Sequence, residues 1–192
     1  MKVSKDTQAL IFDCDGTLAD TMPIHFRGWQ ETLAKRGHDF SEELFYQMAG
    51  IPTEKIVHQL NEKYGTDYIA EEILREKEGL FLKRISEVEP IHHVIEMVHE
   101  YKDKLPLAVA SGGLKELVLK TLDAVGLNHD LFGSIVAAED VQNHKPAPDT
   151  FLLAAKQLNI EPQYCQVYED GDLGIEAALR ANMKVVDIRK WY

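Results

Sequence analysis

The chain has 192 residues, of which 45% are hydrophobic and 28% charged, a composition that can bury a core without disulfides or structural metals. Its 21 basic and 32 acidic residues give a formal net charge of −11 with no concentrated basic patch, so nucleic acid is excluded as an expected partner. The longest apolar runs have only a few residues, far fewer than the roughly 20 that cross a bilayer, so no membrane partner is expected either.

The first predicted strand, Ala9 to Phe12, is followed only after about ninety residues by the next buried strand, Leu107 to Ala110. A crossover between parallel strands needs a few dozen residues at most, so this connection carries an insertion. The insertion predicts a small helical cap over residues 21–86. Its four helices are Pro23 to Arg36, Ser41 to Met48, Glu54 to Tyr64 and Ala70 to Ile85, with breaks at Gly37, Gly50-Ile51-Pro52 and Gly65.

The remaining residues, 1–20 and 87–192, predict one α/β core in which short apolar strands alternate with amphipathic helices. This alternation favours right-handed crossovers and a doubly wound, Rossmann-like parallel sheet. Beyond the insertion the expected order is helix Ile91 to Tyr101, strand Leu107 to Ala110, helix Leu114 to Val125, strand Ser134 to Ala137, helix Thr150 to Leu158, strand Gln166 to Tyr168, helix Leu173 to Ala181 and strand Lys184 to Ile188.

Polar residues follow four of the predicted strands, where open α/β sheets bind their ligands. These segments are Asp13-Cys14-Asp15-Gly16-Thr17-Leu18, Ser111-Gly112-Gly113, the loop that reaches Lys145-Pro146, and Glu169-Asp170-Gly171-Asp172. Two carboxylates two residues apart at a strand end lie on one side of the chain and need a cation. Mg²⁺ prefers such hard oxygen ligands, so Asp13, Asp15 and Asp170 predict a magnesium site.

The same strand ends predict a phosphate site. A carboxylate can attack phosphorus once cations neutralise the repulsion between the two anions, and Lys145 supplies such a charge. Ser111, with the backbone N–H groups of Gly112 and Gly113 opening the next helix, predicts an anion-binding helix N-terminus. Asp172 is expected either to cap the helix that follows it or to bind the metal.

In this order, the four motifs resemble those of the haloacid dehalogenase-like hydrolase superfamily over the whole chain. The flanking residues, among them His25-Phe26-Arg27-Gly28-Trp29 and Lys145-Pro146-Ala147-Pro148-Asp149, resemble its β-phosphoglucomutase-like subfamily. The stretches from Ile135 to Arg189 and from Gly50 to Thr53 are similar to bacterial fructose-1-phosphate phosphatases of that subfamily.

This resemblance implies a phosphatase that acts on a small sugar phosphate, with fructose 1-phosphate as one candidate. Asp13 would be the nucleophile that becomes a phospho-aspartate, and Asp15 the general acid and base. Asp13, the backbone carbonyl of Asp15, and Asp170 would bind Mg²⁺, with Glu169 bonding to its waters. Ser111 and Lys145 would hold the phosphoryl oxygens.

The resemblance leaves a sugar phosphomutase open as an alternative. The mutase pattern places an arginine shortly after the cap-loop glycine, whereas Thr53 follows Gly50-Ile51-Pro52 and no arginine occurs between Arg36 and Arg75. Lys77 and His25 match cap positions that would contact the substrate or gate Asp15. A non-catalytic phosphometabolite-binding protein is a further alternative, although a binder needs no nucleophile beside a proton-transfer group.

Cys14 and Cys165 lie in apolar stretches without any Cys or His metal spacing, so we expect them to be buried and unpaired. The first residues lead into no signal-peptide stretch, and a cytoplasmic location is therefore expected. No protein partner is indicated by the sequence.

Overall fold

The computed structural model describes residues 1–48 and 51–191, and its contacts divide the chain into two compact units. The first consists of Met1–Asp20 with Val88–Tyr192, and the second of Thr21–Glu87. The second unit ends at Glu87, one residue later than the expected cap of residues 21–86. No helix among the described residues is long and apolar enough to cross a membrane.

The first unit contains a five-stranded parallel sheet in the order β5-β4-β1-β6-β7, as expected for a doubly wound α/β fold. β1 lies at its centre and is buried along its whole length, which explains why it reads as a continuous apolar run. The strands are β1 (Ala9–Phe12), β4 (Leu107–Ala110), β5 (Ser134–Val136), β6 (Cys165–Glu169) and β7 (Lys184–Asp187).

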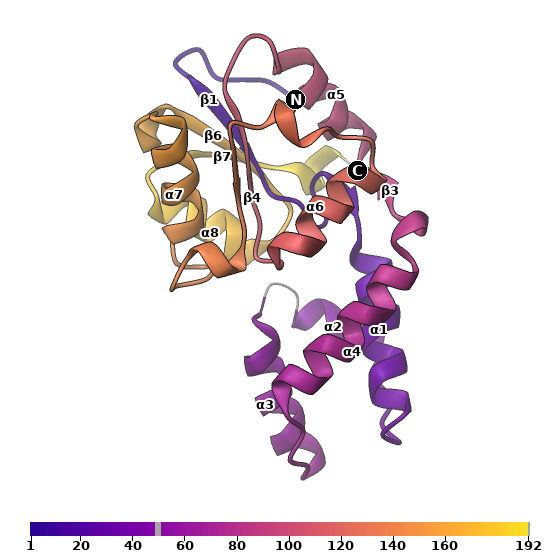
Figure 1. Ribbon diagram of the computed structural model, residues 1–192. Coiled ribbons are helices and arrows are strands. Elements are labelled where there is room, and N and C mark those ends of the chain that lie inside the picture. Colours follow the sequence, from indigo (N-terminus) through magenta and orange to yellow (C-terminus); the bar gives the residue numbers. More distant parts are fainter. Residues whose placement is uncertain (49–50, 192) are drawn as a thin grey trace. The chain divides into compact units, whose positions relative to one another are not determined.

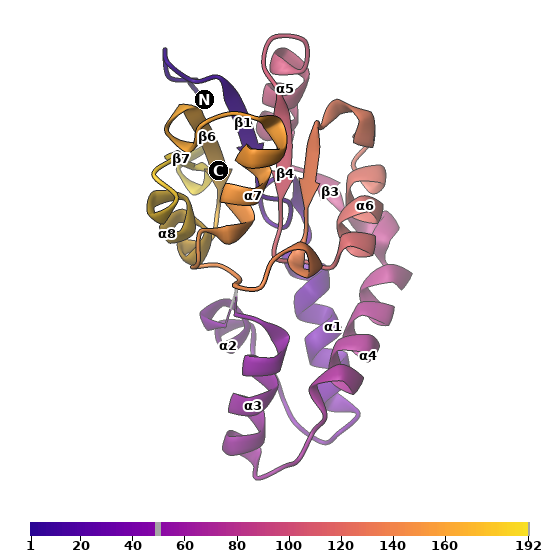
Figure 2. The same cartoon turned by 60° about the vertical axis from the view of Figure 1, so that its left-hand side comes forward.

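Helices cover both faces of this sheet (Figures 1 and 2). Leu10 and Phe12 pack with α5 and α6 on one face, whereas Ala9 and Ile11 pack with α7 and α8 on the other. Alternate residues of β1 thus serve two separate apolar clusters, the pattern that a doubly covered strand requires. The helices are α5 (His92–Tyr101), α6 (Lys115–Ala124), α7 (Asp149–Leu158) and α8 (Asp172–Arg180).

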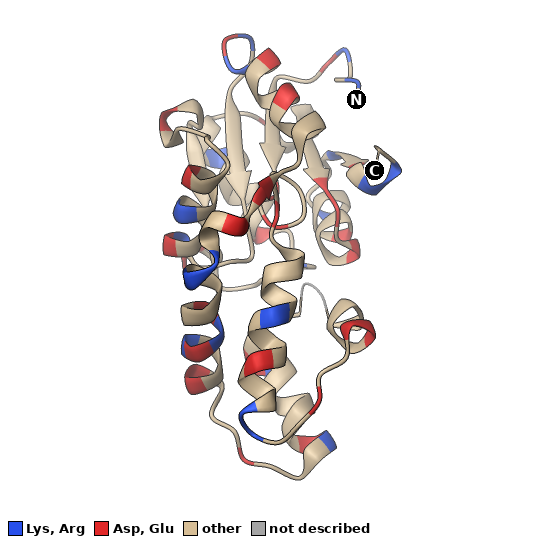
Figure 3. Cartoon of the chain, turned by 90° about the vertical axis from the view of Figure 1, so that its right-hand side faces the viewer, with Lys and Arg blue, Asp and Glu red and all other residues tan. Residues whose placement is uncertain are grey.

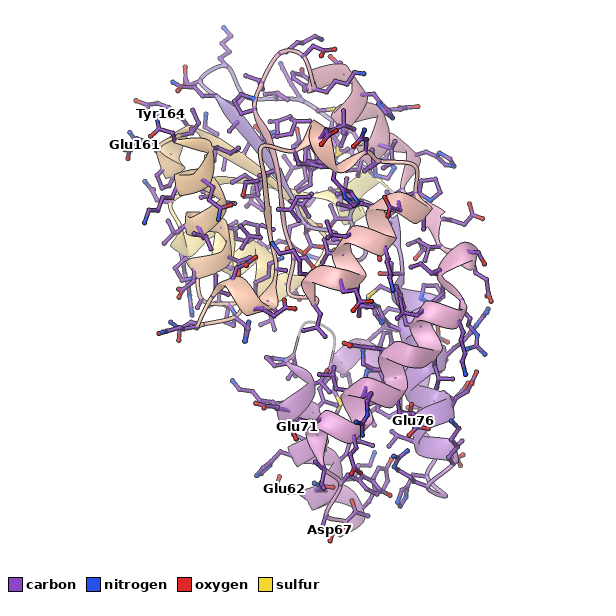
Figure 4. All side chains as sticks on the ribbon, viewed as in Figure 1. Glu62, Asp67, Glu71, Glu76, Glu161 and Tyr164 are labelled. Carbon is purple, nitrogen blue, oxygen red and sulfur yellow. The ribbon has the colours of Figure 1, made fainter. Side chains whose placement is uncertain are left out.

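A second, two-stranded antiparallel sheet was not predicted. It joins β2 (Ala19–Asp20) to β3 (Glu89–Pro90) and so pairs the two chain segments that leave and re-enter the first unit. Short 3-10 helices also complete several loops of the first unit: η2 (His129–Leu131), η3 (Ala138–Asp140), η4 (Pro162–Tyr164) and η5 (Ile188–Trp191). Glu161, which directly precedes η4, and Tyr164, its last residue, are labelled in Figure 4.

The second unit is helical, as expected, and α1 and α4 lie side by side in it (Figures 1 and 2). Its core contains Trp29, Leu33 and Leu60, all buried. Acidic and basic residues are interspersed along its visible helices (Figure 3). Glu76, labelled in Figure 4, pairs with Lys35 and Arg36 at 2.7 Å each. The elements are α1 (Met22–Ala34), α2 (Glu42–Gln47), α3 (Thr53–Tyr64), α4 (Ala70–Lys83) and η1 (Ile85–Glu87). The predicted break at Gly50 lies outside the described residues.

Candidate active site

The turn after β1 brings the first carboxylates to the end of the sheet. The N–H of Asp13 still donates to the carbonyl of Tyr168 on β6, at 3.0 Å, so this side chain is fixed by the last ladder bond of the strand. Gly16 follows with φ of 81°, in the left-handed region that favours glycine. A Cβ at Gly16 would also overlap the carboxylate of Asp170. The predicted bend therefore exists, and it makes room for the acidic residue of another strand end.

Lys145 is held between two buried carboxylates. Its Nζ donates to Oδ1 of Asp13 and to Oε2 of Glu169, at 2.7 Å in both cases. Asp13 and Glu169 are 6% and 3% exposed, so both ion pairs lie largely away from solvent. The ammonium also lies 4.8 Å from the ring centroid of Phe151 on α7. Lys145 thus meets Asp13, which lies 132 positions before it in the chain, and Glu169, which lies 24 positions after it, at one charged centre.

Backbone groups fix the remaining carboxylates. Oε1 of Glu169 accepts the N–H groups of Asp170 and Gly171, at 3.1 and 2.9 Å. Gly174, the third residue of α8, leaves space where a Cβ would overlap the Glu169 carboxylate. The hydroxyl of Thr17 donates to Oδ1 of Asp170 at 2.9 Å, which ties the turn after β1 to the end of β6.

Burial and the neighbouring charges change the pKa values of the site residues. Burial, reinforced by the charge of Glu169, raises the pKa of Asp13 well above its usual value, against the opposing charge of Lys145. Burial and the charge of Glu169 likewise raise the pKa of Asp170 to about 7. Burial lowers the pKa of Lys145, but the charges of Asp13 and Glu169 outweigh that effect and raise it overall.

The carboxylates of Asp13, Glu169 and Asp170 fit a divalent cation. One oxygen from each lies within 4.8 Å of the other two. Burial, and after it the negative charge of Glu169, raises the pKa values of Asp13 and Asp170, and a cation would neutralise that charge. The donors are all hard oxygen atoms, as Mg²⁺ prefers. This is the one group of its kind found among the described residues. His92, His93 and His99 do not join any such group in the described chain.

Ser111 lies beside Asp15, but the loop after β4 differs from the expected one. The Ser111 hydroxyl accepts the N–H of Gly113 at 2.9 Å and lies 3.5 Å from Oδ2 of Asp15. Helix α6 begins only at Lys115, so Gly112 and Gly113 precede the helix rather than open it. The expectation that these glycines open the helix was therefore wrong: the N–H of Gly113 donates to Ser111, and Gly112 is exposed in the loop. A phosphate contact by Gly112 stays a prediction.

Asp172 is not the N-cap that the sequence suggested. Helix α8 starts at Asp172 itself, with Gly171 as its N-cap residue and no side-chain cap. The Asp172 carboxylate instead pairs with Arg189 at 2.9 Å, and the same guanidinium bonds to both oxygens of Asp187. Arg189 thereby joins the end of β7 to the start of α8.

The two predicted cap residues lie in the second unit. The ring of His25 on α1 stacks on Phe81 of α4, with centroids 4.4 Å apart. Lys77 of α4 is 6% exposed, and its Nζ lies 5.8 Å from the ring centroid of Trp29. Their roles toward a substrate stay predictions. Trp29 itself is buried in the helical core, as expected for a packing residue.

The sequence left the role of Thr17 open and did not predict any role for Gly174 or Glu139. Thr17 supports Asp170, Gly174 makes room for Glu169, and both oxygens of Glu139 accept the N–H of Lys115, at 3.1 and 3.0 Å. A glycine inside the predicted helix Leu173 to Ala181 was a usable signal, because glycine in a helix interior costs stability unless close packing requires it. Both cysteines are buried and unpaired, as predicted.

Comparison with known proteins agrees with these observations. A family model described as haloacid dehalogenase-like hydrolase matches residues 10–188. The fructose-1-phosphate phosphatase YqaB of Escherichia coli is 38% identical over 94% of this chain and 95% of its own length. A phosphorylated carbohydrates phosphatase of Thermotoga maritima is 29% identical over 92% of this chain and 82% of its own. The crystal structure of a β-phosphoglucomutase from Clostridium difficile superposes with a TM-score of 0.83 and 26% identity, covering 93% of this chain and 83% of that one.

Proposed function

The chain belongs to the haloacid dehalogenase-like hydrolase family and is a phosphoric monoester hydrolase, and we propose that it acts on small sugar phosphates, with fructose 1-phosphate as the first candidate. The observation that carries the proposal is the charged centre made by Asp13, Glu169, Asp170 and Lys145. Such a centre can bind and activate a phosphoryl group. The names of the relatives from Escherichia coli and Thermotoga maritima support a carbohydrate phosphate as its substrate.

In the proposed reaction, an oxygen of the Asp13 carboxylate attacks phosphorus and forms a phospho-aspartate while the bond to the sugar oxygen breaks. Asp15 donates a proton to that leaving oxygen and then takes one from the water that hydrolyses the phospho-aspartate. The hydroxyl of Ser111, 3.5 Å from Oδ2 of Asp15, is close enough to help orient this carboxyl group. Lys145, already paired with Asp13, binds the phosphoryl oxygens together with Ser111.

A magnesium ion would be held by Asp13, Asp170 and the backbone carbonyl of Asp15, with Glu169 bonding to its waters. When bound, it would neutralise the phosphoryl oxygens and the clustered carboxylates. The pKa of Asp170, raised by burial and by the charge of Glu169, supports this assignment, because a cation would favour its ionised form. The Thr17 hydrogen bond orients Asp170 for this role.

A phosphomutase is the second candidate, because the fold matches that of a β-phosphoglucomutase. Against it, Thr53 opens α3 where the mutase pattern would place an arginine, while Gly50 of the same motif lies outside the described residues. A mutase must bind a second phosphate, and arginine is well suited to bind it bidentately. We therefore favour hydrolysis.

The deciding experiment measures phosphate release by the purified protein from a panel of sugar phosphates, with Mg²⁺ or with EDTA. Isomer formation is assayed in the same wells, with and without a bisphosphate primer. Mg²⁺-dependent release that peaks on fructose 1-phosphate or a related ketose phosphate supports the proposal. Isomer formation without net release would favour the mutase, and binding without either reaction would favour a non-catalytic binding protein.

The second unit is proposed as the cap that selects the sugar, through His25 and Lys77. Replacing either by alanine should raise KM for the preferred sugar phosphate more than it changes hydrolysis of a minimal aryl phosphate, since a binding contact to the sugar is lost. A cytoplasmic location and the absence of nucleic-acid and membrane partners stay predictions from the sequence.

A further inference from the structure

The carboxylate of Glu139 binds the N-terminus of α6. Both of its oxygens accept the N–H of Lys115, the first residue of the helix, at 3.1 and 3.0 Å. The N-cap residue Leu114 offers no side-chain acceptor. Glu139 comes from η3, 24 positions further along the chain, and its side chain is exposed. The positive end of the helix dipole is thus already matched by a carboxylate of the protein itself.

The Glu139 segment is linked through the loop after β4 to Asp15, the proposed proton donor to the leaving group. A Cβ at Gly113 would lie 3.3 Å from Oδ2 of Asp15, so the loop after β4 passes directly beside that carboxyl. The carbonyl of Gly113 accepts the N–H of Ala138, at 2.9 Å, which fixes the start of η3 to the same loop. A leaving group protonated by Asp15 would therefore lie beside the loop that leads into α6, the helix that Glu139 caps.

The basic residues of these two loops are already paired. Within the described segments 111–115 and 137–148, the Lys and Arg residues are Lys115 and Lys145. Lys115 pairs with Asp140 at 2.6 Å and also donates to the carbonyl of Ile135. Lys145 is bound to Asp13 and Glu169 at the reacting centre. Glu139 therefore leaves these two loops with a negative charge that no side chain described within them balances.

We propose that Glu139 is a specificity-determining residue that disfavours substrates whose leaving group carries a second negative charge. This inference rests on the proposed function and names its substrate class: phosphate monoesters of uncharged polyols and sugars, as opposed to phosphorylated carboxylic acids and bisphosphates. A second anion cannot take the α6 N-terminus without displacing Glu139, and near the loop it meets the charge of that carboxylate.

The test uses two substrate pairs that differ in one group, a hydroxymethyl against a carboxylate. These pairs are glycerol 3-phosphate with 3-phosphoglycerate, and sorbitol 6-phosphate with 6-phosphogluconate. The variant Glu139→Gln keeps an oxygen acceptor for the Lys115 N–H but loses the charge. Glu116→Gln is the matched control, because Glu116 is on the first turn of the same helix and its carboxylate binds Lys120 at 2.7 Å instead of the helix end.

We expect Glu139→Gln to raise kcat/KM for the carboxylated member of each pair by about two- to fivefold, the range for one exposed charge, with no change for the neutral member. Glu116→Gln should leave both ratios as in the wild type. Added salt should reduce the preference for the neutral over the carboxylated substrate more in the wild type than in Glu139→Gln. Salt screens an effect of charge but leaves packing unaltered.

The inference would be overturned if the ratio of kcat/KM for the carboxylated member to kcat/KM for the neutral member were the same in Glu139→Gln and the wild type. An equal loss of kcat/KM on both members of a pair would also overturn it, because it would indicate that Glu139 only stabilises the helix end. If fructose 1-phosphate is hydrolysed but the pairs are not, their inhibition constants against it decide the same ratio. If the wild type releases phosphate from no substrate, including fructose 1-phosphate, the proposed function itself fails and this inference with it.

Discussion

Replacing Asp170 with asparagine should stabilise the metal-free protein. Asp13, Glu169 and Asp170 each place an oxygen within 4.8 Å of the other two, and Lys145 bonds to Asp13 and Glu169 rather than to Asp170. Two like charges at this separation repel by about 3 kcal/mol at an effective dielectric constant of about 20. Asparagine removes that repulsion and keeps the oxygen that accepts the Thr17 hydrogen bond.

After allowance for attraction to Lys145 and for solvent, we expect a gain of about 1–3 kcal/mol at pH 8, or roughly 3–8 °C in Tm. The gain should depend on pH. The pKa of Asp170 is raised to about 7, from 3.8, by burial and by the charge of Glu169, so its contribution to wild-type stability is complete below about pH 4 and lost as the pH rises through 7. The stability difference between the variant and the wild type should therefore be clearly smaller at pH 5 than at pH 8.

The assay is thermal unfolding in EDTA at pH 5 and 8, repeated with Mg²⁺. A cation that binds the native state should stabilise the wild type at pH 8 and shift Asp170→Asn much less, while phosphate release by the variant falls sharply. Asp172→Asn is the control: that side chain is 86% exposed and pairs with Arg189, so its loss should cost under about 1 kcal/mol. A lower Tm for Asp170→Asn in EDTA at pH 8, or an unchanged response to Mg²⁺, would refute the reasoning.

Three other substitutions probe different parts of the molecule. Asp13→Asn should lower phosphate release by about a thousandfold or more with a native circular dichroism spectrum, because the proposed nucleophile is lost, and substantial residual turnover would contradict that role. Gly174→Ala should lower the free energy of unfolding by about 1–3 kcal/mol and also lower kcat, because the new Cβ overlaps the Glu169 carboxylate. Gly79→Ala, whose Cβ would have nothing within 4 Å, should raise the free energy of unfolding by about 0.4–1 kcal/mol, and urea unfolding compares the two variants. Leu60→Ala, at a fully buried position of the helical unit, should cost about 2–5 kcal/mol in the same measurement, and a loss below 1 kcal/mol would show that this cluster repacks.

The sequence predicted the core strands well because a strand covered on both faces is a run of apolar residues. Its errors lie at strand ends, where side chains decide. β5 ends at Val136 because the N–H of Ala137 donates to Asp140, and β7 ends at Asp187 because that carboxylate accepts the N–H of Arg189. β6 includes Glu169, which apolar patterning excluded although its side chain is buried. The pair β2 and β3, with two residues each, is too short to have any periodicity.

The positions of the site residues were predictable to the extent that parallel strands end at one edge of the sheet. That rule places Asp13, Lys145 and Asp170 near one another without any knowledge of their side-chain geometry. It does not reveal that Glu139 caps α6, because this bond depends on how two loops 24 positions apart pack together. Local patterns predicted that Gly112 and Gly113 open this helix, whereas it begins at Lys115 and its first N–H donates to Glu139.

Gly16 and Gly174 leave space for carboxylates at this edge of the sheet. One is in the turn after β1 and the other in α8, yet each leaves the volume that a clustered carboxylate occupies, Asp170 in one case and Glu169 in the other. Stability alone does not require this arrangement, because glycine in a helix weakens it and buried like charges repel one another. Both costs disappear if apolar residues fill the same space. That two separate segments accept them is best explained by the need to hold these carboxylates around a cation and a phosphoryl group.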